Sequence, residues 1–285
     1  MNIYGWLQII IYLAVILALA KPLGSYMARV FGGEKTFLHP VFGPVERFIY
    51  RLAGVKPDAD LSWKEYVLAL LLFNVLGILV VYALQRLQLW LPLNLMGFGP
   101  VAPDLAFNTA VSFATNTNWQ AYGGETTMSY LTQMLGLAVQ NFFSAATGMA
   151  AMMAFIRGFA RATVKGIGNA WVDLVRSTLY ILLPISFIIA LILISQGVVQ
   201  NFRPYQTANL LQPISYEKPK LDAAGQPLKD AQGKPITETM VVKEQVLPLG
   251  PAASQIAIKG APGGTPRGAP SARARRSARS PRRGR

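Results

Sequence analysis

The 285-residue chain contains no cysteine, a single histidine (His39) and few charged residues. Without cysteine, it offers no disulfide, no thiolate nucleophile and no thiolate metal ligand. A single histidine also argues against a histidine-rich metal site or a histidine-based catalytic triad. Charged residues make up 14% of the chain, against about 25% in an average soluble protein. Together with the 52% of hydrophobic residues, this depletion favours a membrane protein.

Four apolar segments are long enough to cross a bilayer, which takes about 20 helical residues. They cover residues 3–20, 65–84, 127–156 and 172–196. Glu65 and Asp173 fall in the first turn of their segments, where the positive end of the helix dipole favours negative charge. We find no charged residue deep within a span, which argues against a proton relay and favours selection by neutral oxygen ligands.

Positive charges are distributed unevenly between the spans. Residues 21–64 contain seven Lys or Arg and residues 157–171 contain three, whereas residues 85–126 contain only Arg86. Lys and Arg are enriched in cytoplasmic loops. The pattern therefore predicts a multi-pass membrane protein with its N-terminus outside.

A short apolar segment between the second and third spans cannot cross a membrane by itself. Pro103 and Asp104 are a helix-start signal, and residues 105–114 are apolar. Ten helical residues rise about 15 Å, half a bilayer. The polar run 115–118 follows, and irregular backbone at membrane depth is tolerated only where protein buries it or where it lines a cavity.

This pattern has two interpretations. In the first, a re-entrant half-helix points its C-terminal carbonyls toward the membrane centre, and an extended strand then aims further oxygens at a dehydrated cation. In the second, residues 85–126 form an external loop on the surface. Residues 247–259 (LPLGPAASQIAIK) begin a similar short apolar segment after the fourth span, which favours the first interpretation because transporters often contain internal repeats.

The polar run and its neighbours resemble a known family. TNTNWQAYGGE (115–125) follows GPVAPDLAFNTAVSF and precedes LTQMLGL (131–137) and QNF (140–142). These motifs resemble the potassium-binding A subunit of the bacterial Kdp potassium-transporting ATPase, and LPLGPAASQIAIK resembles the second pore helix of the same family. The resemblance covers about residues 1–259.

The resemblance implies an all-α polytopic membrane protein built from the helix–pore–helix repeats of the potassium transporter superfamily, with about 1.5 of four repeats present. The chain then divides as follows: residues 1–64, an extra N-terminal span and cytoplasmic loop; 65–156, the first repeat with its filter; 157–259, an incomplete second repeat; and 260–285, a disordered arginine-rich tail.

The resemblance also implies a site for K+, the transported ion, at the first filter. Glu125 either raises the local cation concentration or is a solvated loop carboxylate. The expected ion-binding residues are Thr115, Asn116, Thr117 and Asn118, and the expected flanking residues are Trp119, Gln120, Gly123, Gly124 and Glu125.

In this family the subunit binds extracellular K+ and passes it to a P-type ATPase subunit in the bacterial inner membrane. The implied partners are that catalytic subunit, small accessory membrane subunits and membrane lipid, and no nucleic acid. The chain shows no P-loop and no phosphorylatable aspartate motif, so we expect ATP hydrolysis on a partner and no enzymatic activity here. The alternative is a non-transporting membrane scaffold that anchors partner subunits.

The C-terminal segment departs from the family pattern. Residues 260–285 contain only Gly, Ala, Pro, Ser, Thr and Arg, and they carry eight of the arginines behind the net charge of +14. Such a composition cannot bury a core. We interpret the segment as the product of a frameshift or sequencing error, and expect residues 1–285 alone to be inactive. The alternative is an arginine-rich tail that binds anionic lipid or nucleic acid.

Overall fold

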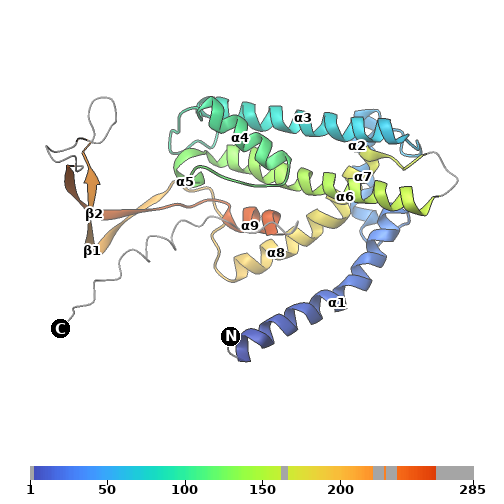
Figure 1. Ribbon diagram of the computed structural model, residues 1–285, viewed down its shortest axis with the longest axis horizontal. Helices are drawn as coiled ribbons and strands as arrows, with labels where there is room; N and C mark the ends of the chain where they lie inside the picture. Colours follow the sequence, from blue (N-terminus) through green and yellow to red (C-terminus); the bar gives the residue numbers. More distant parts are fainter. Residues whose placement is uncertain (1–2, 162–165, 221–227, 229–235, 261–285) are drawn as a thin grey trace.

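The computed structural model describes residues 3–161, 166–220, 228 and 236–260, and shows a bundle of helices from which a two-stranded ribbon projects (Figure 1). The arginine-rich tail expected at 260–285 lies outside the described residues from residue 261 onward. Its first residue, Gly260, is instead the last residue of helix α9 (Ala252–Gly260).

Among the described residues, four helical segments are long and apolar enough to cross a membrane. The segments are α1 (Ile3–Phe31); α3 (Trp63–Leu87) with η1 (Gln88–Trp90); the π-helix η2 (Thr132–Ala138) with α6 (Val139–Ala160); and α7 (Ala170–Arg176) with the π-helix η3 (Ser177–Leu182) and α8 (Leu183–Ser195). These segments confirm the predicted all-α polytopic class. The first span is longer than predicted, because α1 continues beyond residue 20 to Phe31.

The third span begins later than predicted, at Thr132 rather than at residue 127. A four-residue helix, α5 (Gly124–Thr127), precedes it, and Met128 then adopts extended backbone with φ −125° and ψ 134°. This extended residue separates the two helices, so the segment predicted from residue 127 is not helical throughout.

The start of α3 is fixed by a reciprocal cap. The side-chain oxygen of Ser62 accepts a hydrogen bond from the Glu65 backbone (3.4 Å), and the Glu65 carboxylate accepts one from the Ser62 backbone (2.8 Å). This capping box satisfies two backbone donors that a helix start leaves unpaired. It explains why an acidic residue stands at this end of an otherwise apolar span.

Two connections contain regular structure that the sequence analysis did not predict. Residues 21–64 include α2 (His39–Ala53), which ends at Gly54 in left-handed backbone. The segment after the fourth span contains an antiparallel ribbon of β1 (Gln206–Pro219) and β2 (Thr237–Leu247), with a register shift between Asn209 and Ile214. Most residues of both strands are exposed, so the ribbon adds an extended element to the helical class.

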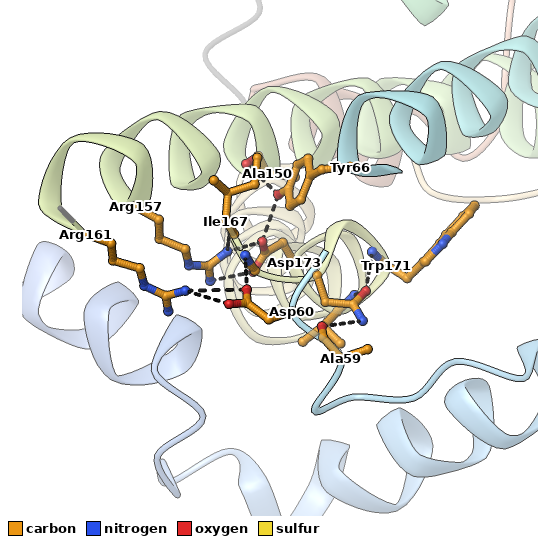
Figure 2. A network of polar contacts seen from close by, with 12 residues as sticks. Ala59, Asp60, Tyr66, Ala150, Arg157, Arg161, Ile167, Trp171 and Asp173 are labelled. Atoms are coloured by element: carbon orange, nitrogen blue, oxygen red, sulfur yellow. Dashed lines mark hydrogen bonds and ion pairs between the residues drawn. The ribbon is translucent and has the colours of Figure 1, made fainter. Parts of the chain in front are cut away.

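A polar network joins three spans at the end of the bundle where α3 begins and α6 ends (Figure 2). Asp173 is 1% exposed, accepts a hydrogen bond from Arg157 Nη2 at 2.9 Å and lies 2.8 Å from the Tyr66 hydroxyl. At its edge, Asp60 accepts a hydrogen bond from the Gly168 backbone and pairs with Arg161. The network holds α3, α6 and α7 together on this side.

Candidate functional site

The short helix α4 (Pro103–Ala114) packs inside the bundle. Ala106, Ala110 and Phe113 are buried against α3 and η2. Gln85 of α3, which is fully buried, donates hydrogen bonds from Nε2 to the Ala106 and Val81 carbonyls, both at 3.0 Å. Twelve residues rise about 18 Å, less than the roughly 30 Å of a bilayer core. A helix of this length with one face buried supports the pore-helix interpretation.

The run after α4 does not form the extended strand that we expected. Asn116 and Asn118 have φ values of 56° and 54°, in the left-handed region. Asparagine enters this region more readily than most side chains, and β-branched residues enter it with difficulty. The two asparagines therefore let the chain turn tightly against the end of α4.

The backbone N–H groups of residues 115–119 all donate to the last turns of α4. Those of Thr117 and Asn118 both reach the Ser112 carbonyl, at 2.9 and 3.1 Å. That of Trp119 reaches the Ser112 side-chain oxygen at 2.6 Å. Within the described part of the chain, no group donates a hydrogen bond to the carbonyls of residues 115–118. All the N–H groups of residues 115–119 are therefore hydrogen-bonded, whereas the carbonyl oxygens of residues 115–118 have no donor among the described residues.

Side chains in the run bond to one another and to α6. The hydroxyls of Thr115 and Thr117 lie 2.9 Å apart, and the Asn118 amide donates to Asn116 Oδ1 at 3.3 Å. Ser144 on α6 donates to the same Asn116 oxygen at 3.3 Å. The run is thus braced by α4 on one side and by α6 on another.

The predicted flanking residues lie around this run. Trp119 is exposed, and Gln120 donates to the Tyr122 hydroxyl at 3.1 Å. Gly123 and Gly124 lead into α5, whose first turn contains Glu125. The Gln133 amide donates to the Gly124 carbonyl at 3.2 Å, which ties the outer turn to η2.

A cavity of about 610 Å³ separates this region from the second short helix, α9. Gln120 and Glu125 line it beside the run 115–118, Gln133 and Asn141 on the third span, and Lys259 on α9. Asn141 is only 5% exposed, and its Oδ1 has no hydrogen-bond partner among the described residues. The cavity thus lies between residues that flank the run 115–118 and the second short helix, and its walls contain both polar and apolar side chains.

The predicted site residues do not include three polar residues of this region. Ser112, Ser144 and Asn141 lie in the apolar segments that we assigned to helices, and each is less than a tenth exposed. A hydroxyl in the last turn of a half-helix is a signal that could have identified Ser112. Asn141 had a signal in the motif QNF (140–142), whereas Ser144 could be identified only once the packing of α6 was known.

Comparison with known proteins decides the family. Residues 10–274 match the family described as the potassium-transporting ATPase A subunit. The chain belongs to this family. The match confirms the resemblance drawn from the motifs, and it continues past Lys259 to residue 274. The family is that of a transport subunit and not of the catalytic ATPase subunit.

Curated relatives of the family are named as potassium-transporting ATPase potassium-binding subunits. The one from Ralstonia pickettii (strain 12J) is 60% identical over 268 residues, which cover 93% of this chain and 45% of the relative. The one from Methylococcus capsulatus is 60% identical over 259 residues, 91% of this chain and 43% of the relative. The Bordetella pertussis relative is 57% identical over 251 residues, 88% and 42% respectively. The chain thus spans less than half the length of these relatives.

Proposed function

We propose that residues 115–118 are one filter segment of a K+-binding and translocating subunit in an ATP-driven, high-affinity potassium uptake complex. One observation carries the proposal. The backbone N–H groups of the run donate hydrogen bonds to α4, whereas its carbonyl oxygens accept none from the described residues. A dehydrated cation needs oxygen ligands to replace its water. We propose that the carbonyl oxygens of residues 115–118, unpaired within the described part of the chain, supply such ligands.

The end of α4 supplies a matching field. The C-terminal end of a helix carries about half a negative charge, which favours a cation beside it. The hydroxyls of Thr115 and Thr117 and the amide oxygens of Asn116 and Asn118 add neutral oxygens to the same run. Neutral ligands hold a monovalent cation weakly enough to release it, as conduction requires.

Membership of the family supports the remaining parts of the proposal. One filter segment cannot enclose an ion, so we propose that the other segments come from the rest of a full-length protein, and that residues 1–285 alone support no uptake. The ion then passes to a P-type ATPase subunit, with small accessory subunits, in the bacterial inner membrane. The N-terminus lies outside, and α4 enters from the external side.

The proposal is tested by changing the backbone and the side chains separately. Residues 1–259 are joined to the remainder of the Ralstonia pickettii relative, and the chimera is assembled with its partner subunits. Asn118→Val removes the left-handed conformation, whereas Asn118→Gly keeps it and removes only the side chain. We expect the valine variant to bind K+ about tenfold more weakly or worse, and the glycine variant to stay closer to the parent.

The measurement is the K+ concentration that half-saturates the ATPase activity of the complex. Asn108→Val, at an exposed position of α4, is the matched control and should leave that concentration unchanged. Equal loss in both Asn118 variants would assign binding to the amide side chain. No loss in either would contradict the filter and support a non-transporting scaffold that anchors partner subunits.

A further inference from the structure

Helix α2 buries polar side chains and exposes apolar ones, the reverse of a helix on the surface of a soluble protein. Its inward face contains Glu46, which is 6% exposed, and the buried Tyr50. Its outward face presents an apolar stripe with one residue in each turn, and Phe48 is 63% exposed. The members of the stripe are Val41, Val45, Phe48 and Leu52. Apolar groups in water cost about 25 cal/mol per Å², so this stripe needs a cover.

The buried face fixes the helix in this orientation. The Glu46 carboxylate accepts hydrogen bonds from Arg176 Nε at 2.9 Å, the Tyr50 hydroxyl at 2.8 Å and the Tyr180 hydroxyl at 2.7 Å. Burial alone would raise the pKa of Glu46, but the hydrogen bonds from Tyr180, Arg176 and Tyr50 outweigh it and lower the pKa below its ordinary value. Rotating α2 to hide the stripe would break these bonds and leave Arg176 without its carboxylate.

The depth of α2 follows from its contact with the fourth span. Arg176 lies six residues after the start of that span at Ala170, about 9 Å along the helix. The span has 26 residues, a length of about 39 Å, so a centred bilayer core of about 30 Å begins about 4–5 Å from each end. Glu46 and its helix therefore lie close to the boundary between hydrocarbon and headgroups.

Charged and aromatic residues accompany the stripe. Arg47 and Arg51, one turn apart, are both exposed, and neither forms an ion pair with another described residue. Phe37 and Trp63, at the nearby end of the bundle, are also exposed. Arginine extends its charge to headgroups while its stem lies along apolar surface, and aromatic rings favour the same depth.

We propose that α2 is an interfacial helix, which inserts its outward stripe into the leaflet on the side where α1 ends and α3 begins. Arg47 and Arg51 then bind the phosphates of anionic lipids. The partner is the bilayer surface, because α2 connects two spans, lies at the boundary depth and continues their lipid-facing apolar surface. This inference does not depend on the proposed filter.

The absence of cysteine permits a direct test. Phe48→Cys and Leu52→Cys are labelled with a nitroxide in vesicles of phosphatidylcholine and phosphatidylglycerol, both in the 285-residue chain and in the assembled chimera. Collision with oxygen reports lipid, and collision with a soluble nickel chelate reports water. Leu72→Cys on the outer surface of α3 is the lipid control, and Leu211→Cys on the ribbon is the water control.

We expect labels at Phe48 and Leu52 to be open to oxygen and protected from nickel, as at Leu72. Nickel access equal to that at Leu211 would overturn the proposal. Loss of oxygen access in the assembled complex would also overturn it, because the stripe would then be covered by protein. Two positions are used so that a single variant that fails to fold does not decide the result.

The arginines are tested with a fluorescent donor, in place of the nitroxide, attached to Phe48→Cys. A fluorescent phosphatidylglycerol or phosphatidylcholine headgroup is mixed into the vesicles, and energy transfer from a donor at this cysteine measures which lipid gathers there. We expect enrichment of the anionic lipid to fall about fivefold for each of Arg47→Gln and Arg51→Gln. Lys218→Gln and Lys243→Gln, exposed on the ribbon, remove the same charge elsewhere and should change nothing. An equal fall in both pairs would contradict a site on α2.

Discussion

Replacing Asp173 with asparagine will lower the free energy of unfolding of the bundle by about 3–5 kcal/mol. The carboxylate is 1% exposed, and the side chain of its partner Arg157 is only 12% exposed. Removing one charge of a buried pair leaves the other without compensation, which costs more than the pair itself contributes. Unfolding by sodium dodecyl sulfate in mixed micelles, followed by circular dichroism, measures the loss.

Asp60→Asn is the matched control, because Asp60 belongs to the same network but its ion pair is exposed. Asp60 and Arg161 are each 40% exposed and lie 3.5 Å apart. Such pairs contribute about 0–1 kcal/mol, and asparagine keeps an oxygen for the Gly168 backbone. The double variant Arg157→Met with Asp173→Leu should recover most of the loss. Equal losses for Asp60→Asn and Asp173→Asn would contradict the account.

Replacing Ser112 with alanine will weaken K+ binding by the chimera about tenfold and reduce its preference for K+ over Na+. The Ser112 hydroxyl accepts a hydrogen bond from the Trp119 backbone and donates one to the Trp119 carbonyl at 3.0 Å. Both bonds hold the end of the filter run against α4. Without them the Trp119 N–H loses its acceptor, and the adjacent carbonyls are free to move away from the ion. Half-saturation of ATPase activity by each cation gives both quantities.

Ser186→Ala is the control for this variant. Ser186 is also buried, and its hydroxyl donates to the Leu182 carbonyl at 2.9 Å within the fourth span, away from the filter. Its replacement removes one buried hydroxyl and its hydrogen bond, and should change neither the affinity for K+ nor the selectivity. If Asn118→Val weakens binding while Ser112→Ala changes neither affinity nor selectivity, the proposed filter is retained but the role proposed for Ser112 is wrong.

The spans and the short helix were predictable because length and hydropathy decide them. The end of α1 was not, because its continuation to Phe31 contains Pro22 and Lys21, which suggested a loop. Helix α2 escaped prediction because Pro40, Gly43 and Pro44 interrupt its pattern. Pro40 stands in its first turn, where the missing N–H costs nothing.

The long-range ion pair and the exposed strands could not be predicted from the sequence. Arg176 reaches its partner Glu46 across 130 residues, so neither residue reveals the other. The ribbon was missed because its strands are exposed on both faces, which leaves no alternation of apolar and polar residues to recognise. The left-handed backbone of the filter run had a signal in its two asparagines, but an extended strand was expected instead.

The most direct test of the filter is to locate the ion. The assembled chimera is crystallised with Tl+ in place of K+, and the anomalous scattering of the metal is mapped. The account predicts a peak within about 3 Å of the backbone carbonyl oxygens of residues 115–118. A filter that is ordered but empty at saturating Tl+, or an ion bound only elsewhere in the protein, would contradict it.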